Sequence, residues 1–246
     1  MQDIEAIERA TLDAVPPRRL VQWGDWLLAL DDGTVGRCHS AVPLAHGGAS
    51  PGVLPELERR YREAGLPLVL RVPELAAFTP LHEALRAQGY ARGKPTLVQT
   101  GELAALLAAR PAEGELAIEV APGGEWEQVF LGEGFDPVDG ASRLAILRRG
   151  RDSLFASVRV QGRTVAVGSA CTSHGWCGVH GMRTLPAWRG RGFAGAILAA
   201  LAQAALARGV QRCFLQVEAA NANAQALYAR RGFATAWAYA YWQRAR

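Results

Sequence analysis

Apolar residues recur along the chain at two spacings, one typical of helices and one typical of strands. Over the first hundred residues they predict two strands within 24–44 around an Asp31-Asp32-Gly33 turn, since turn formers separate two apolar runs. The following elements are a helix over 51–65, a strand over 66–72, a helix over 80–89 and a strand over 94–100. This part of the chain therefore mixes helices and strands.

Proline, glycine and charged residues interrupt the pattern over residues 108–116. We interpret them as the linker between a first domain, residues 1–110, and a second domain, residues 111–246. In the second domain the pattern predicts a strand over 116–120, helices around 125–134 and 141–150, strands over 154–160, 164–173 and 176–185, a long helix ending at Ala207, a strand over 212–217, a helix over 222–232 and an aromatic last strand over 233–242.

The two halves repeat one order of elements: a hairpin, a helix, a strand, a shorter helix and a last strand. The segment LRAQGY at 85–90 also echoes YARRGF at 228–233. This similarity suggests an old duplication. The predicted fold class is α/β (α+β), with a mixed, mostly antiparallel sheet and flanking helices in two tandem copies.

Composition and charge exclude several classes of protein. Half of the 246 residues are hydrophobic, which allows a substantial core, and the net charge is only +4. Lys94 is the only lysine; residues 1–110 hold 12 basic and 13 acidic residues, and the rest hold 15 and 10. We therefore expect no nucleic-acid partner, although any bound anion should be met in the second half.

The chemistry of the cysteines and of the first residues points to the cytoplasm. The four cysteines are scattered without a C-x-x-C pair, as expected of thiols in a reducing compartment. The first 17 residues lack the basic flank and apolar stretch of a signal peptide. Residues 193–207 fall short of the roughly 20 apolar residues that a bilayer requires, so we expect no membrane partner.

The segment 187–207, AWRGRGFAGAILAALAQAALA, joins a predicted strand to a predicted helix. Unpaired N–H groups at a helix start, helped by the helix dipole, favour an anion there. Gly190 and Gly192 would let a ligand approach the main chain, and Arg189 and Arg191 would add charge. Taken alone, the string equally fits a plain strand-to-helix turn with solvated arginines.

A second segment adds the context that the first lacks. The loop Arg189, Gly190, Arg191, Gly192, Phe193, Ala194 fits the pattern [QR]-x-x-G-x-[GA], and Asn221, Ala224, Leu227, Tyr228, Gly232, Phe233 fit N-x-x-A-x-x-L-Y-x-x-x-G-F. Both patterns, in this order and spacing, resemble the core of the GNAT superfamily of N-acetyltransferases. The resemblance covers roughly residues 115–246, whereas residues 1–110 lack the loop and resemble a degenerate, non-catalytic GNAT-like repeat.

The resemblance implies a role for each matching residue. Acetyl-CoA would lie between two splayed parallel strands, with the main chain of Met182, Arg183 and Thr184 bonding its pantetheine arm and Asn221 on the other side. Amides within Gly190, Arg191, Gly192, Phe193 and Ala194 would bind the pyrophosphate, next to Arg189. The Tyr228 hydroxyl would protonate the departing thiolate, a reasonable role for a donor of pKa about 10. For an isolated tyrosine, a core position would be the other interpretation.

The base that deprotonates the amine is harder to identify, because residues 176–184 contain no Asp or Glu where the family often has one. Gly178 is near that position. His180 faces the same side of the strand and has an ordinary pKa of about 6.5, so we take it as the candidate catalytic base. A packed, inert histidine remains the alternative, and Glu133 and Asp136 are weaker candidates.

A metal site is the competing explanation for the recurrence of Cys171, His174, Cys177 and His180 at every third residue. A two-residue turn at His174-Gly175 would pair residue 171 with 178 and residue 169 with 180. Cys177 would then face away from Cys171 and His180, so the four side chains could not converge. We expect no metal.

The sequence therefore predicts an N-acetyltransferase that moves an acetyl group from acetyl-CoA to a primary amine by direct attack, with a small-molecule or peptide acceptor and a possible homodimer. The alternatives are a catalytically silent acyl-CoA-binding regulatory module, which the missing strand acid favours, and an RNA-associated role, which the modest charge disfavours. The identity of the acceptor cannot be read from the sequence.

Overall fold

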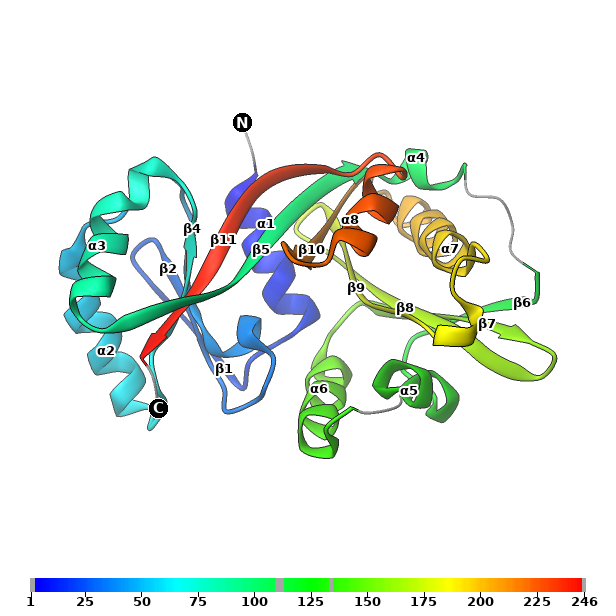
Figure 1. Ribbon diagram of the computed structural model, residues 1–246, viewed down its shortest axis with the longest axis horizontal. Helices are drawn as coiled ribbons and strands as arrows, with labels where there is room; N and C mark the ends of the chain where they lie inside the picture. Colours follow the sequence, from blue (N-terminus) through cyan, green and yellow to red (C-terminus); the bar gives the residue numbers. More distant parts are fainter. Residues whose placement is uncertain (1–2, 109–112, 133–134, 245–246) are drawn as a thin grey trace.

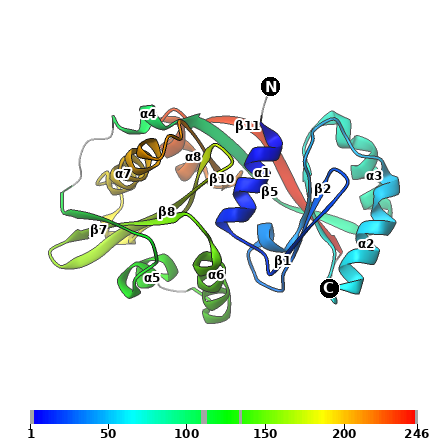
Figure 2. The same ribbon diagram turned by 180° about the vertical axis from the view of Figure 1, so that it is seen from behind.

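The computed structural model describes residues 3–108, 113–132 and 135–244, which form one eleven-stranded sheet with helices on both faces (Figure 1, Figure 2). The strand order is β1-β2-β3-β4-β11-β5-β10-β9-β8-β7-β6. The strands are β1 Arg19–Trp23, β2 Trp26–Leu30, β3 Ala41–Pro43, β4 Val69–Pro73, β5 Tyr90–Glu102, β6 Glu115–Glu119, β7 Ser153–Val160, β8 Arg163–Ser173, β9 Trp176–Thr184, β10 Arg212–Glu218 and β11 Ala234–Arg244. Only β3/β4 and β9/β10 pair in parallel, which confirms the predicted mixed, mostly antiparallel sheet.

Eight helices flank this sheet in the described part of the chain. They are α1 Ile4–Ala14, α2 Leu54–Glu63, α3 Thr79–Ala87, α4 Leu103–Leu106, α5 Gly124–Leu131, α6 Pro137–Arg149, α7 Phe193–Ala207 and α8 Ala222–Ala229. In the second half, α7 packs its buried Ile197 and Leu201 on one face of the sheet. Helices α1, α5 and α6 lie on the opposite face (Figure 1).

The sheet shows an internal repeat. Helix α2 connects the parallel strands β3 and β4, and helix α7 connects the parallel strands β9 and β10. The strands that follow are exchanged: β5 pairs with β10, and the C-terminal strand β11 lies between β4 and β5. The predicted boundary between residues 110 and 111 lies outside the described residues, and strands from both sides of it alternate in the middle of the sheet.

The predicted tight turn at residues 31–33 is wrong. Strands β2 and β3 do pair in antiparallel fashion, but a loop over 31–40 containing a 3-10 turn, Gly36–His39, separates them. The cause is tertiary: the Asp31 carboxylate accepts hydrogen bonds from Gly33 N at 2.6 Å and Arg18 N at 2.8 Å and pairs with Arg149 of α6 at 2.7 Å. The tight hairpin is instead that of β1 and β2, across Gly24.

Candidate functional site

Strands β9 and β10 separate part-way along their length. Their parallel pairing runs from Trp176 opposite Arg212 to Val179 opposite Leu215. Beyond these residues β9 continues to Thr184 and β10 to Glu218, where β9 is paired with β8 and β10 with β5. The main chain of Met182, Arg183 and Thr184 therefore borders an opening between two strands, as the sequence predicts for the splayed pair.

A bulge at Gly181 changes the side of the sheet to which β9 side chains point. Ser169 is opposite His180, whereas Val167 is opposite Arg183, so β9 has one extra residue, and Gly181 has a φ of +61°. Val179 and Met182 consequently both pack on the α7 side. The Arg183 side chain points to the other side, where its guanidinium donates to Leu131 O at 2.6 Å.

The loop before α7 has the backbone that the sequence predicts for an anion cradle. Gly190 and Gly192 have φ values of +78° and +87°, a left-handed conformation that favours glycine. A Cβ at either position would meet nothing within 4 Å, so the space above the loop is open. Helix α7 begins at Phe193, whose buried ring anchors the first turn, and the N–H groups of that turn lack helical acceptors.

The two loop arginines are held beside this cradle. Arg189 Nε donates to Thr184 O at 3.3 Å, at the end of β9. Arg191 lies with its guanidinium carbon 4.5 Å from the centroid of the Trp188 ring and also pairs with Glu113. Both side chains are exposed, so their charge is accessible to an anion on the loop.

In the equivalent loop of the first half, between β3 and β4, Gly47 is open but Gly48 is covered. A Cβ on Gly48 would lie 2.4 Å from the carbonyl oxygen of Ala77, so the main chain of a neighbouring segment already covers it. His46 beside it packs edge-on against Trp237, with 5.0 Å between ring centroids. The loop before α7 therefore has open space at both of its left-handed glycines, whereas the first-half loop is covered at its left-handed Gly48.

The second motif lies on α8, on the α7 side of the sheet. Asn221 Oδ1 accepts from Ala224 N at 3.1 Å and caps the helix, which leaves the side-chain amide NH₂ for a ligand. Tyr228 is 8% exposed, and its ring packs edge-on against Phe233. Burial raises the pKa of Tyr228, so its hydroxyl stays protonated at neutral pH.

His180 lies on the opposite side of the sheet from Tyr228, next to the Phe214 ring, whose centroid is 6.0 Å away. It is 6% exposed, and neither ring nitrogen has a hydrogen-bond partner among the described residues. Burial, followed by the positive charge of Arg37, lowers the pKa of His180 to about 3. The imidazole is therefore neutral at pH 7, but it is a weak proton acceptor.

Position 178, near which the family often has an acid, is tightly packed. A Cβ on Gly178 would lie 2.7 Å from Phe214 Cζ and 2.8 Å from His180 Nε2. An aspartate or glutamate at this position would therefore collide with the two rings that fill its place.

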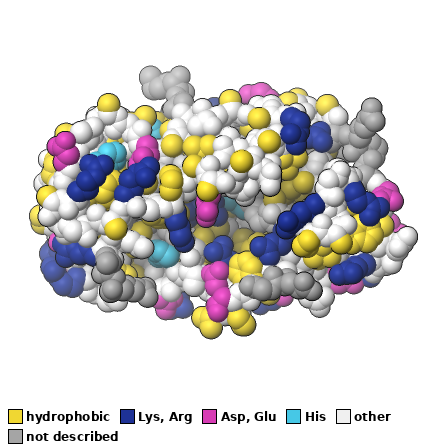
Figure 3. All heavy atoms as spheres, in the orientation of Figure 1, with side chains coloured by type: hydrophobic (Ala, Val, Ile, Leu, Met, Phe, Trp, Pro, Cys, Tyr) yellow, Lys and Arg dark blue, Asp and Glu magenta, His cyan; other side chains and the backbone are white. Residues whose placement is uncertain are grey.

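Two cavities border these elements. The larger, of about 680 Å³, lies between α5, the β7/β8 turn and the end of β9, and reaches Arg183, Thr184 and Arg189. The smaller, of about 290 Å³, lies on the His180 side between β5, β10, β11, α6 and the loop 34–39. Figure 3, in the orientation of Figure 1, shows Lys and Arg side chains gathered around the hollow in the middle of the view. The larger cavity touches the loop before α7 at Arg189. The smaller cavity adjoins the β9/β10 opening through Gln216 and Glu218 of β10.

Residues of the first half that the sequence analysis missed line this smaller cavity, namely Arg37, Lys94 and the main chain of Gly36. Glu218 and Tyr241 of the second half also line it. A position at the end of a parallel strand beside an opening is a signal that could have indicated Glu218. No local pattern could have indicated Arg37, because its place depends on how the two halves pack together.

The sequence offers Glu133 and Asp136 as weaker base candidates. Glu133 lies outside the described residues. Asp136 caps α6, with its Oδ1 accepting from Asp139 N at 2.8 Å, and it is exposed. That carboxylate therefore has a structural role at the helix start.

The region suggested for a metal has the register that the sequence predicts: Cys171 is opposite Gly178 and Thr172 is opposite Cys177. Within the described ranges, no three His, Cys, Asp or Glu side chains come together as metal ligands would. In the same ranges, no helix is both long enough and apolar enough to span a bilayer.

Comparison with known proteins agrees with this geometry. Residues 1–242 match the family described as "Probable histone acetyltransferase Rv0428c C-terminal". The chain belongs to this family of GNAT N-acetyltransferases. The match includes the first half, which agrees with a sheet shared by both halves.

The relatives of this GNAT chain match it over nearly the full length of both chains. It is 25% identical over 237 residues to "Uncharacterized N-acetyltransferase YobR" of Bacillus subtilis, covering 95% of each chain. A GCN5-related N-acetyltransferase from Kribbella flavida has the same fold, with a TM-score of 0.72, 19% identity and coverage of 100% and 97% of the two chains. A tandem GNAT protein from the clavulanic acid biosynthesis pathway has a TM-score of 0.61 at 17% identity, covering 98% and 94%.

Proposed function

We propose that this protein transfers the acetyl group of acetyl-CoA to a primary amine by direct attack within a ternary complex. The observation that supports this most strongly is the open loop 189–194, with two left-handed glycines, directly before α7 and beside the β9/β10 opening. Both left-handed glycines of this loop leave space for a diphosphate, whereas the left-handed Gly48 of the equivalent first-half loop is covered by the main chain of Ala77.

The residues present fit acetyl-CoA as a substrate. Amides of Gly190 to Ala194 would bind the diphosphate at the positive end of the α7 dipole, next to Arg189. The main chain of Met182 and Thr184 would bond the pantetheine arm along β9, and the Asn221 side-chain amide would bond it from α8. Acetyl-CoA supplies a thioester, whose acetyl carbon would lie in the opening between β9 and β10.

Tyr228 would act as the acid that protonates the leaving sulfur. Tyr228 packs on the α7 side of the sheet, from which we expect the thioester to enter. Because burial raises the pKa of Tyr228, the proton is present throughout the neutral range.

Two groups are candidates for the base. His180 is neutral and unpartnered, but a pKa of about 3 gives it little driving force to accept a proton. Glu218 is the one carboxylate that lines the smaller cavity, at the end of β10. We therefore propose Glu218 as a second candidate base besides His180. The pH profile of kcat/KM in His180→Gln and Glu218→Gln distinguishes the two, because loss of the base removes the acid limb of that profile.

Release of free CoA thiol from acetyl-CoA over a panel of amines tests the proposal. We expect Tyr228→Phe to lower kcat by about tenfold to a hundredfold while the acetyl-CoA affinity stays unchanged, because the hydroxyl acts only on the leaving group. Tyr90→Phe is the matched control, since its hydroxyl bonds to Glu58 outside both cavities. Equal kcat in Tyr228→Phe and the wild type would contradict the assigned role.

The second candidate function is a silent acyl-CoA-binding module. The packed position of Gly178, where a carboxylate cannot fit, is the observation that favours it. Binding of acetyl-CoA without thiol release for any amine would support this function over catalysis.

A further inference from the structure

The smaller cavity has a basic lining that both halves of the molecule supply. Arg37 comes from the loop before β3, Lys94 and Arg92 from β5, and Arg143 from α6, against Glu218 as the only carboxylate that lines it. A cavity with four cationic side chains and one carboxylate favours an anionic group.

Two of these four cations already have partners. Arg92 binds both carboxylate oxygens of Glu74, and Arg143 pairs with Asp139 at 3.0 Å. Arg37 and Lys94 make no ion pair within the described ranges. No ion pair among the described residues neutralises these two charges, although Lys94 helps to lower the pKa of Asp139 and Arg37 partly offsets the raised pKa of Glu8.

Lys94 is held in an unusual backbone conformation at the edge of this cavity. Its φ is +47°, within a bulge where Thr96 is opposite Tyr239 and Gly93 is opposite Tyr241. A left-handed conformation is unfavourable for lysine, and such strain is common where a side chain contacts a ligand. The bulge also takes Lys94 out of the regular pairing of β5 with β11.

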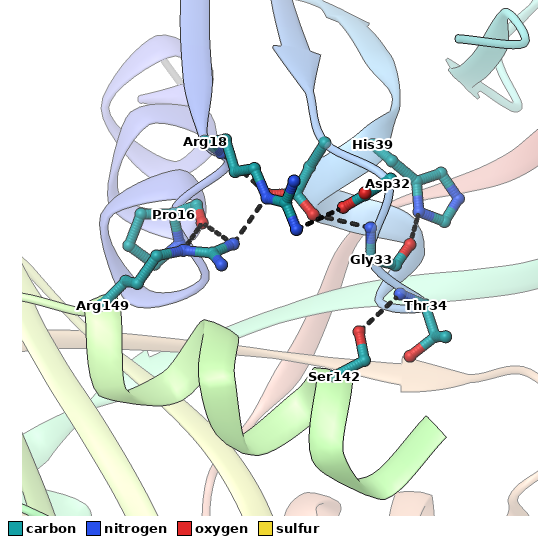
Figure 4. Close-up of polar contacts among 9 residues, drawn as sticks. Pro16, Arg18, Asp32, Gly33, Thr34, His39, Ser142 and Arg149 are labelled. Carbon is teal, nitrogen blue, oxygen red and sulfur yellow. Dashed lines mark hydrogen bonds and ion pairs between the residues drawn. The ribbon is translucent and has the colours of Figure 1, made fainter. Parts of the chain in front are cut away.

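The loop that contains Arg37 is held by contacts with α6, several of which Figure 4 shows. Thr34 N donates to Ser142 Oγ at 3.0 Å, and Arg149 pairs with Asp31. His39 Nδ1 donates to Gly33 O at 2.7 Å, which fixes the loop internally. This loop reaches the His180 side of the sheet, where Arg37 and Tyr241 line the same cavity.

We propose that this cavity binds the acceptor and selects an amine that also has an acidic group, a carboxylate or a phosphate, with Arg37 and Lys94 facing the acid and Glu218 facing the ammonium. This inference rests on the proposed function, since it names the acceptor class of the same site. It disfavours lysine-rich peptides, because their extra cations would meet the same basic lining.

Matched pairs of small amines test the selection: alanine with alaninamide, and O-phosphoethanolamine with ethanolamine. Both members of a pair have the amine, and only one has the acid. We expect kcat/KM to be at least tenfold higher for the acidic member, as for a charge-assisted hydrogen bond worth about 1.5–3 kcal/mol. The amino acid pair and the phosphate pair together show which acid the cavity prefers.

Variants show whether the cavity is responsible. Arg37→Gln and Lys94→Gln should each lower kcat/KM for the acidic amine about tenfold more than kcat/KM for its neutral counterpart. Arg62→Gln is the control, because Arg62 is an exposed arginine of α2 outside both cavities. Calorimetric titration of acetyl-CoA should give the same affinity in all three variants.

Binding of the same amines, measured by calorimetry with CoA present, separates this proposal from the proposed function. If no amine is acetylated but the acidic amines bind more tightly in an Arg37-dependent manner, the proposed catalytic function is wrong. The selective binding of acidic amines in this cavity is then supported. If neutral amines or a lysine-rich peptide bind or react better than acidic ones, or if Arg37→Gln affects both members of a pair equally, the inference is overturned.

Discussion

Gly192 precedes α7 with a φ of +87°, which an alanine adopts only at a cost of about 1–2 kcal/mol. We expect Gly192→Ala to move the loop towards negative φ, displace its amides and weaken acetyl-CoA binding about tenfold in a calorimetric titration. Gly209→Ala is the matched control at the other end of α7, with a φ of +81° and equally open space. Equal acetyl-CoA affinities in the two variants would contradict an amide cradle at residues 190–194.

His180 makes folding stability depend on pH on the acid side. Burial lowers its pKa from 6.5 to about 3, so between these values the unfolded chain binds a proton that the folded chain does not. The stabilisation is therefore complete above pH 6.5 and is lost as the pH falls towards 3. His180→Gln should lose less unfolding free energy than the wild type between pH 7 and pH 4.5, as measured by urea unfolding.

Part of this acid sensitivity should remain in His180→Gln, because burial also lowers the pKa of His46, to about 4. The double variant with His46→Gln should show the smallest dependence. An identical slope in the wild type and His180→Gln would show that His180 is hydrated and titrates normally.

At the scale of elements, helix α1 is joined to strand β4 by a fully buried ion pair. Arg71 Nη1 lies 2.9 Å from Glu8 Oε2, and Arg71 also donates to Ser40 Oγ at 3.2 Å. Because α1 covers β8 and β9 while β4 belongs to the first half, this pair joins the two halves.

Removal of one partner should be costly. We expect Arg71→Met to lower the free energy of unfolding by about 3–5 kcal/mol, because the Glu8 carboxylate would stay buried without its partner. The double variant Glu8→Met with Arg71→Met should recover much of that loss in urea unfolding. A double variant that loses the sum of the two single losses would contradict the coupling.

Elements with local signals were predictable from the sequence, and those with tertiary causes were not. Strand β9 and helix α7 follow from their apolar spacing, and the His174-Gly175 turn is present with φ values of +50° and +75°. The loop over 31–40 was mispredicted because its shape depends on Arg149, an α6 residue far along the chain. The same holds for the site. The loop 189–194 and the motif over 221–233 were recognisable in the sequence, whereas the place of Arg37 depends on how the two halves pack together.

At the scale of the whole molecule, the exchanged strands make each half depend on the other. Residues 111–246 alone would leave β10 without β5 and β11 without both of its neighbours. We expect this fragment to be unfolded or aggregated by circular dichroism and size exclusion, and to fold when mixed with residues 1–110. A stable, monomeric 111–246 fragment would contradict this dependence.

Hydrogen–deuterium exchange with and without acetyl-CoA tests the central claim most directly, because it reports on amides in both halves at once. We expect acetyl-CoA to slow exchange in peptides covering 180–185 and 189–196 and to leave 44–53, the equivalent loop of the first half, unchanged. Unchanged exchange over 189–196, or slowing confined to 44–53, would contradict the claim that acetyl-CoA is bound at the start of α7.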